Sequence, residues 1–428
     1  MECQPREDLV QLQLERLQAT LNRAYRNVPF YHNRFEQVGV EPSHFRSLED
    51  LSRLPLTSRD DLSMNYPYGL FAVPLRDIVR IHSTTGTDVR PTVSGYTRKD
   101  LKVWKELVAR CLCGAGVGPE DIIQICFDPG LADWAREFKD GAEAMQASVI
   151  PMTVMEIPKQ IMVMNDYKTS VLVSTPSYLR QIIREMTRMG INPNALSLKR
   201  AVLLGETLSQ KTRTFLADSL HINIHTAYGL SEVPGPGIAY ECNEHDGLHI
   251  NEDHFVVEII DPESGAVLPA EQNGEVVLTT LTAQAYPLVR FRTGDRGSIT
   301  MESCNCGRVF ARLRQGRGRT DSQLVIRGVK IHPRLIEGII SQLVQGKKTS
   351  YVGFVRRQEE LDLLEIWIEV DEDNFSDEIK VLEQLVHRMR QELEQRLGIP
   401  ARVRLVESMS MAACREHLGR IVDQRTNG

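Results

Sequence analysis

The sequence predicts an α/β fold in two parts, a large N-terminal domain and a smaller C-terminal α+β domain. At 428 residues the chain is longer than most single domains. From residue 77 onward, short runs rich in β-branched residues alternate with stretches of helical periodicity, a pattern typical of a sheet covered by helices. The glycines and arginines of residues 316–319 indicate a linker, so we expect domains at residues 1–317 and 318–428.

The N-terminal domain is expected to open with a helix over residues 8–28, where leucines recur at helical spacing before Pro29. The β-rich runs that follow are residues 78–83, 92–97, 122–127, 147–152, 170–175, 200–205 and 223–229. In a sheet of this kind, the loops at the strand ends carry the ligand.

The later part of the chain changes pattern twice. Residues 253–269 and 274–299 alternate in the manner of antiparallel strands and contain turn sequences, which predicts a small β-subdomain. Beyond the linker, the predicted order is helix, strand, strand, helix, strand, at residues 333–345, 351–357, 363–370, 376–398 and 401–408. This order describes a compact α+β domain.

Composition excludes several classes of protein. The net charge of −6 offers no basic surface for nucleic acid, and no apolar run approaches the roughly 20 residues of a membrane span. The N-terminus lacks a secretory signal pattern, so we expect a cytoplasmic protein. Its eight cysteines are therefore expected to be thiols or metal ligands, not a disulfide framework.

The loop at residues 228–237 has the most distinctive composition. Ser231 and Glu232 precede a run of prolines and glycines that cannot form a regular helix or a central strand. A rigid loop with a carboxylate can hold a metal-bound phosphate, because Mg²⁺ takes one or two carboxylate oxygens and completes its shell with water and substrate. A solvated connecting loop has the same composition, so these residues alone leave both interpretations open.

The segment from Tyr228 to Val233, followed by Gly235-Pro236-Gly237, resembles the signature of the phenylacetate-CoA ligase family of adenylate-forming enzymes. The resemblance extends over residues 80–423. It implies a large adenylate-forming domain and a C-terminal lid that rotates between two half-reactions. The implied activity is attack of an aromatic or arylacetic carboxylate on MgATP to give an acyl-adenylate, followed by transfer of the acyl group to CoA.

Residues 83–92 combine hydroxyls, a glycine and a cation on one turn, which can wrap a polyphosphate, although a hairpin connection has the same composition. The chain departs from the family's phosphate loop at Val89 and Arg90, where the family has glycine and lysine. Arg90 is still expected to meet phosphate as a catalytic cation. The other contacts implied for this loop are Ser83, Thr84, Thr85, Gly86 and Thr87.

The resemblance also implies contacts from other loops. Tyr228 is expected beside the adenine and Ser231 near the phosphate, with Glu232 as the catalytic Mg²⁺ ligand. Asp295 is expected to receive both ribose hydroxyls. The remaining implied roles are nucleotide contacts from Gly205, Glu206, Gly229 and Arg319, and a hinge at Asp321.

Three aromatic residues are candidates for the acyl pocket. Trp134 and Phe138 lie four apart on an expected helix and therefore share a face. Side chains in this pattern are more often part of the core. Tyr178 follows Thr175 and Pro176, a helix start that also resembles a family stretch beside the pocket.

A second cluster indicates a metal. Cys242 and His249 precede a strand-rich segment and Cys304 and Cys306 follow it, so they can provide three sulfurs and one nitrogen for a tetrahedral structural zinc. Buried thiols are the alternative, and His245 is a rival fourth ligand. Zinc-containing members of the family carry a similar set.

The family's C-terminal lysine, which bridges the carboxylate and the α-phosphate, aligns with His417. Loss of such a contact lowers the rate by on the order of 10²-fold to 10³-fold. The replacement by His417 is therefore expected to affect adenylation, whereas thioester formation does not need that lysine.

The expected ligands are ATP, Mg²⁺, CoA, a small carboxylic acid and structural Zn²⁺, with no nucleic acid and no membrane. A homodimer is the commonest closed assembly. The alternatives are adenylation with an amine or carrier-protein acceptor, and a degenerate paralogue that binds nucleotide or acyl-adenylate without adenylating because of His417.

Overall fold

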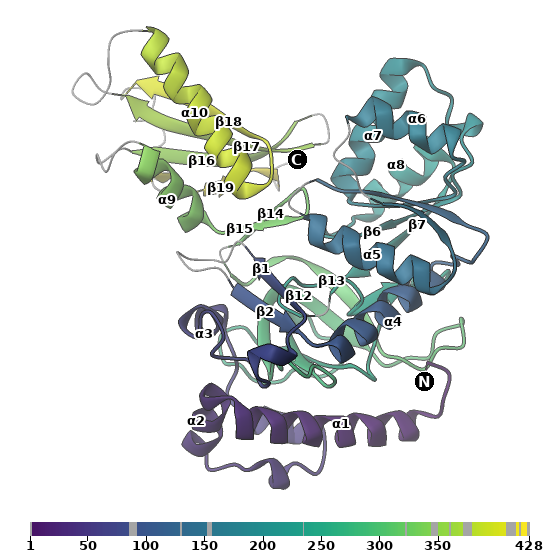
Figure 1. Ribbon diagram of the computed structural model, residues 1–428, viewed down its shortest axis with the longest axis vertical. Coiled ribbons are helices and arrows are strands. Elements are labelled where there is room, and N and C mark those ends of the chain that lie inside the picture. The colour runs from purple at the N-terminus through teal and green to yellow at the C-terminus, as the bar shows by residue number, and fades with distance from the viewer. Residues whose placement is uncertain are drawn as a thin grey trace.

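The computed structural model describes residues 2–84, 92–128, 131–151, 156–233, 235–321, 323–343, 350–358, 361–370, 379–407, 417–418 and 421–425. In Figure 1 the first two helices lie along the bottom of the molecule, the C-terminal domain lies at the upper left, and α6, α7 and α8 of the N-terminal domain lie at the upper right. No helix among the described residues combines the length and the apolar character that crossing a membrane requires.

Three helices open the chain, and the helix predicted over residues 8–28 is confirmed by the first of them. They are α1 (Arg6–Asn27), α2 (Pro29–Gln37) and α3 (Arg59–Met64). A capping box starts α3, because the side chain of Ser58 accepts from the Asp61 amide and that of Asp61 accepts from the Ser58 amide. This cap fixes the position of Arg59, the first residue of α3.

A large mixed sheet forms the centre of the N-terminal domain. Within the described ranges it has 11 strands, in the order β10-β11-β12-β13-β9-β8-β7-β6-β5-β3-β4. Its parallel half is β3 (Ile122–Cys126), β4 (Ser148–Ile150), β5 (Val171–Ser174), β6 (Arg200–Leu203) and β7 (Asn223–Tyr228). The accompanying helices are α4 (Arg98–Gly114), α5 (Ala132–Ala144), α6 (Ile157–Asp166), α7 (Pro176–Met189) and α8 (Gln210–Leu220). The α/β prediction is confirmed.

The antiparallel half continues the same sheet beyond β7. It consists of β8 (Ala239–Glu241), β9 (Leu248–Ile250), β10 (Phe255–Ile260), β11 (Gly274–Thr280), β12 (Phe291–Thr300) and β13 (Arg312–Arg319). The register of β12 and β13 places Asp295 opposite Arg319. A separate hairpin of β1 (Arg80–Thr84) and β2 (Thr92–Tyr96) flanks the expected phosphate loop. Short 3₁₀ turns occur at Pro42–His44, Glu49–Arg53, Leu75–Asp77 and Pro193–Ala195.

The C-terminal domain begins with a small hairpin of β14 (Leu324–Ile326) and β15 (Val329–Ile331). It continues with α9 (Pro333–Leu343), β16 (Tyr351–Gln358), β17 (Leu361–Val370), α10 (Ile379–Leu397), β18 (Ala401–Glu407) and β19 (Ile421–Asp423), and its sheet has the order β18-β17-β16-β19. The expected boundary after residue 317 falls inside β13, which continues to Arg319.

The β14–β15 hairpin packs on the large domain. Ile326 and Val329 belong to the same buried apolar cluster as Leu131 and Trp134. At the tip of the hairpin, Gly328 approaches so closely that a Cβ there would lie 2.9 Å from the side chain of Leu131. The hairpin therefore carries residues of the C-terminal domain to the carboxyl ends of the parallel strands.

Candidate active site

A cavity of about 710 Å³ lies where the carboxyl ends of β6 and β7 meet β12, β13 and the C-terminal domain. Its walls on the large domain include Ser83, Trp134, Gly205, Glu206, Tyr228, Gly229, Ser231, Glu232, Asp295, Arg319 and Asp321. The C-terminal domain closes the cavity with Lys330, Arg357, Asp362, Arg396, Asp423 and Arg425. Most of the predicted nucleotide contacts in the described ranges therefore face one space.

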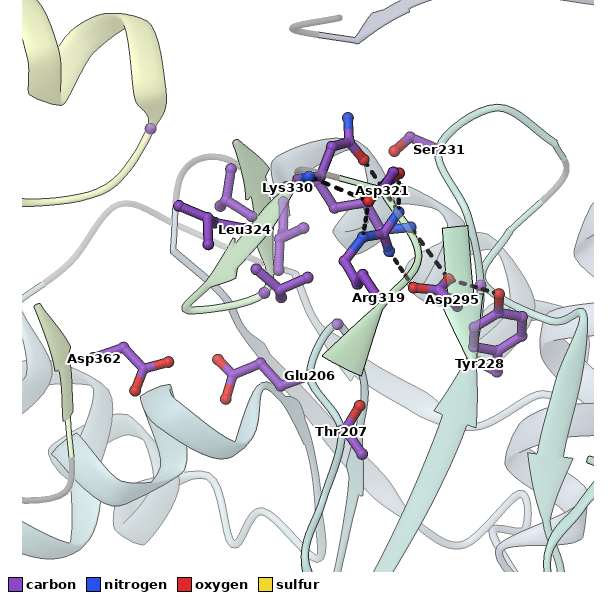
Figure 2. Close-up of a pocket in the computed structure, with 18 of the residues that line it drawn as sticks. Glu206, Thr207, Tyr228, Ser231, Asp295, Arg319, Asp321, Leu324, Lys330 and Asp362 are labelled. Atoms are coloured by element: carbon purple, nitrogen blue, oxygen red, sulfur yellow. Dashed lines mark hydrogen bonds and ion pairs between the residues drawn. The ribbon is translucent and has the colours of Figure 1, made fainter. Parts of the chain in front are cut away.

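Asp295 is the centre of a charged group on one side of the cavity (Figure 2). The hydroxyl of Tyr228 donates to its Oδ2 atom over 2.8 Å, and Arg319 donates to Oδ1. Lys330 Nζ lies 3.4 Å from Oδ2. Burial would raise the pKa of Asp295, but the charges of Lys330 and Arg319 outweigh burial and hold the pKa below its usual value. Asp295 is therefore an ionised acceptor.

Glu232, the expected magnesium ligand, is 3% exposed and forms an ion pair with Arg59. Arg59 also lies 3.6 Å from Asp321 and donates to the Thr293 carbonyl over 3.0 Å. Burial lowers the pKa of Arg59 to about 10, so the guanidinium stays charged at neutral pH. The Oε2 atom of Glu232 is buried and has no hydrogen-bond partner among the described residues. A cation can satisfy that oxygen, so Glu232 fits a metal-ligand role.

Glu206 lies at the other end of the cavity. The Ser177 hydroxyl donates to it over 2.9 Å. The carboxylate of Asp362, from β17, faces Glu206 in Figure 2. Burial, and then the charge of Asp362, raise the pKa of Glu206 to about 7. Two carboxyl groups therefore face each other where the two domains meet.

Gly205 allows a close approach of two backbones at the same end. It has a φ of +85°, and a Cβ there would lie 3.1 Å from the Cα of Gly328.

The candidates for the acyl pocket are separated. Trp134 lines the cavity. Phe138 is fully buried and packs beside Phe127, and Tyr178 belongs to the apolar cluster around α7. Neither of these two rings is part of the cavity wall, because Phe138, one turn further along α5 than Trp134, and Tyr178 on α7 are both packed inside apolar clusters.

Of the two expected catalytic cations, Arg90 and His417, the structure describes only His417. Arg90, with Thr85, Gly86 and Thr87, lies outside the described residues. Thr84 ends β1, next to Ser83 in the cavity wall. His417 is half-buried and does not line the cavity in this arrangement of the domains.

The thiol cluster is defined as Cys242, His249, Cys304 and Cys306. His249 lies on β9, Cys242 directly follows β8, and Cys304 and Cys306 lie between β12 and β13. Its ligand atoms are all within 4.8 Å of one another. The sulfurs of Cys242 and Cys304 are 3.7 Å apart, which matches two thiolates at about 2.3 Å from one tetrahedral zinc.

His249 is oriented for the same role. Cys306 Sγ lies 3.3 Å from its Nε2 atom, while its Nδ1 atom lies 3.3 Å from the Phe310 carbonyl. A proton on Nδ1 leaves Nε2 free for a metal. Burial lowers the pKa of His249 to about 4, so the ring is neutral. The rival residue His245 instead lies 3.5 Å from Glu241. These residues therefore fit a structural zinc.

Sequence reasoning missed Arg59, Lys330 and Asp362. The capping box at Ser58 predicts where α3 starts, but no local pattern indicates that Arg59 reaches Glu232. Lys330 and Asp362 become cavity residues only through the docking of the C-terminal domain. No sequence spacing encodes that docking.

The chain is similar to characterised ligases over nearly its whole length. It is 38% identical over 419 residues to the phenylacetate-coenzyme A ligase of Thermus thermophilus, covering 95% of this chain and 94% of that protein. It is 37% identical over 423 residues to that of Escherichia coli, covering 98% and 95% respectively. Residues 328–425 match the family model described as AMP-binding enzyme C-terminal domain.

Solved structures distinguish the arrangement of the domains. A 2-hydroxyisobutyryl-CoA ligase in complex with 2-HIB-AMP and CoA, in the thioesterification state, has a TM-score of 0.89 and 26% identity over 99% of this chain and 91% of that chain. That ligase in the postadenylation state, with 2-HIB-AMP, has a TM-score of 0.71 and 25% identity over 100% and 92%. The domains of this chain are therefore arranged more as in the thioesterification state.

The resemblance first drawn from the loop after Tyr228 is confirmed by these full-length similarities. The fold class is confirmed as well, because a large α/β domain precedes an α+β domain that matches the AMP-binding C-terminal model. The chain belongs to the phenylacetate-coenzyme A ligase family.

Proposed function

We propose that this protein is an ATP-dependent, AMP-forming acid–thiol ligase that converts an aromatic or arylacetic carboxylate into its CoA thioester. In the first step the carboxylate attacks the α-phosphorus of ATP, giving an acyl-adenylate and pyrophosphate. In the second step the CoA thiolate attacks the acyl carbon and AMP leaves, while the thiol proton is lost. The observation that carries this proposal is the cavity, whose charged wall on the large domain is closed by the C-terminal domain.

Each wall of the cavity has a proposed part in nucleotide binding. Asp295, an ionised acceptor, receives the two ribose hydroxyls. Tyr228 and Gly205 enclose the adenine, and Glu206 accepts a hydrogen bond from its amino group. Gly229, Ser231 and Ser83 lie along the phosphates, with Thr84, Thr85, Gly86, Thr87 and Arg90 as further contacts of the same loop.

The metal roles follow the donor sets. Glu232 would hold Mg²⁺ through its unpartnered Oε2 atom, and the ion would neutralise phosphate charge. The thiol cluster would hold one Zn²⁺ with four protein ligands. A site with no open position fastens the strands together and takes no part in the reaction.

The acyl group would extend from the nucleotide toward Trp134 on α5. Asp321 lies two residues after the end of β13 and is paired with Arg319 and Arg59, so a rotation of the C-terminal domain would turn about this residue. The arrangement described here suits the second step, because residues of the β14–β15 hairpin line the cavity and His417 does not.

A second candidate function is thioester formation from an acyl-adenylate made elsewhere. His417 favours it, since this residue replaces the lysine that the family uses in adenylation. Transfer to an amine or a carrier-protein thiol would differ only in the acceptor.

The test is to incubate the protein with MgATP, CoA and a panel of arylacetic and benzoic acids, and to follow CoA thioesters and AMP by mass spectrometry. We expect one acid to give thioester and AMP in equal amounts. Thioester from supplied adenylate alone would select the second candidate, and no thioester under either condition would contradict both.

A further inference from the structure

Lys330 is a cation that the C-terminal domain inserts into the nucleotide cavity. It lies on β15 and lines the cavity with Ser231 and Glu232. Its side chain is only 19% exposed, although lysine side chains are mostly exposed in proteins. The hairpin is held in place at its tip, where Gly328 meets Leu131 and Arg327 lies 3.8 Å from Asp128.

The only acidic group paired with this ammonium among the described residues is Asp295, which already has two stronger partners. Tyr228 donates over 2.8 Å and the guanidinium of Arg319 donates a charge-assisted hydrogen bond, whereas Lys330 Nζ lies 3.4 Å away. A contact of that length is the weakest of the three. A ligand that offers hydroxyl donors to Asp295 would therefore displace Lys330 first.

We propose that Lys330 is the residue through which the C-terminal domain recognises the α-phosphate of the bound adenylate or AMP. The ribose hydroxyls take the place of Lys330 at Asp295, and the freed ammonium turns to the phosphate that continues from the same ribose. This inference rests on the proposed function only in taking an adenine nucleotide as the ligand.

The surroundings of Lys330 favour such an exchange. Arg319 on β13 and Arg59 on α3 repel its charge, while Asp295 on β12 and Asp321 after β13 attract it. Burial outweighs the attraction and lowers the pKa of Lys330 to about 7. A phosphate brought next to the amine adds negative charge and raises its pKa, so nucleotide binding should take up a proton near neutral pH.

AMP and adenosine differ only in the phosphate that Lys330 is proposed to bind. Their affinities, measured by isothermal titration calorimetry, therefore test the role of Lys330 directly. For Lys330→Gln we expect AMP to bind about tenfold or more weakly, the size of a lost charged hydrogen bond, with adenosine affinity changed less than about twofold. Lys330→Arg should retain most of the preference for AMP. Lys211→Gln, an exposed lysine on α8, is the matched control and should bind both ligands as the wild type does.

The pH dependence gives a second readout. Between pH 7 and 9 the affinity of the wild type for AMP should fall, because the amine loses its charge, whereas the affinity of Lys330→Arg should stay level.

Equal weakening of AMP and adenosine by Lys330→Gln, or no weakening of either, would overturn the role of Lys330 and leave the proposed function standing. A wild type that binds neither ligand would overturn both. Circular dichroism of Lys330→Gln checks that the variant is folded before either conclusion is drawn.

Discussion

The charged wall of the cavity and the thiol cluster are both built on the large sheet, but they differ in how far their polar atoms are already paired. In the cavity, buried polar atoms remain without hydrogen-bond partners among the described residues, including Glu232 Oε2 and Glu206 Oε1. In the thiol cluster, the ligand atoms converge within 4.8 Å and His249 is already oriented by a backbone carbonyl.

This difference indicates that the thiol cluster contributes mainly to the stability of the fold, whereas the cavity contributes mainly to ligand binding. A buried polar atom without a hydrogen bond costs stability until a ligand satisfies it, so nucleotide binding should stabilise the cavity. The converging thiols would contribute stability through the proposed structural zinc. Substitutions in the cavity should therefore change kinetics with little loss of stability, and substitutions in the cluster should do the reverse.

The largest effect is expected from Asp295→Ala. Removing the acceptor of two charge-assisted hydrogen bonds, each worth roughly 1.5–3 kcal/mol, should lower kcat/KM for ATP by about 10²-fold to 10³-fold. Steady-state kinetics over a range of ATP concentrations measure it. The melting temperature should change little. Full activity with a lowered melting temperature would reverse the comparison, and Asp295→Asn should lose less because it keeps one acceptor oxygen.

The second prediction concerns His417→Lys, a substitution that lies in neither the cavity wall nor the thiol cluster. Because a lysine at this position would bring a permanent cation to the carboxylate in the adenylating orientation, we expect carboxylate-dependent exchange of labelled pyrophosphate into ATP to rise about tenfold or more. Thioester formation from supplied adenylate should be unchanged, since His417 does not line the cavity in this orientation. If exchange does not rise, the alignment of His417 with the family lysine is wrong.

Cys304→Ser tests the thiol cluster. Metal analysis should find about one zinc per wild-type chain and much less in the variant, whose melting temperature should fall by on the order of 5–10 °C. Its kcat/KM at low temperature should stay within about threefold, because the site has no open position. The exposed Cys113 provides the control, Cys113→Ser. A metal-free wild type, or an unchanged melting temperature, would show that the cluster is a set of plain thiols.

The smallest effect is expected from Glu206→Gln. The raised pKa of about 7 means that the folded state holds a proton that the unfolded chain releases near pH 4.5. Stability contributed by this group is present at low pH and is lost as pH rises toward and through 7. The variant should therefore melt about 1–3 °C above the wild type at pH 8, with the difference vanishing near pH 4. Calorimetric scans at both pH values measure it, and a variant less stable than the wild type at pH 8 would contradict the assignment.

Much of the fold could be predicted from the sequence, because its signals are local. The leucine spacing of α1, the β-rich runs of the parallel sheet and the αββαβ order of the C-terminal domain all depend on periodicity within one segment. The start of the linker was predicted less accurately, because β13 continues through the arginines of the predicted linker as far as Arg319.

Residues of the candidate site could be predicted from the sequence only where they belong to a recognisable motif. Tyr228, Glu232 and Asp295 stand in motifs of the family and face one cavity. Phe138 was chosen because it shares a helix face with Trp134, but spacing cannot tell which turn of α5 reaches the cavity. The position of Lys330 in the cavity could not be predicted, because it depends on how the two domains dock.

The most direct test of the account is to supply preformed phenylacetyl-adenylate and CoA to the wild-type protein and follow the products in a single turnover. We expect phenylacetyl-CoA and AMP in equal amounts, because the C-terminal domain is already arranged as in the thioesterification state of a CoA ligase. Adenylate that binds tightly and remains unconverted in the presence of CoA would contradict a thioester-forming cavity.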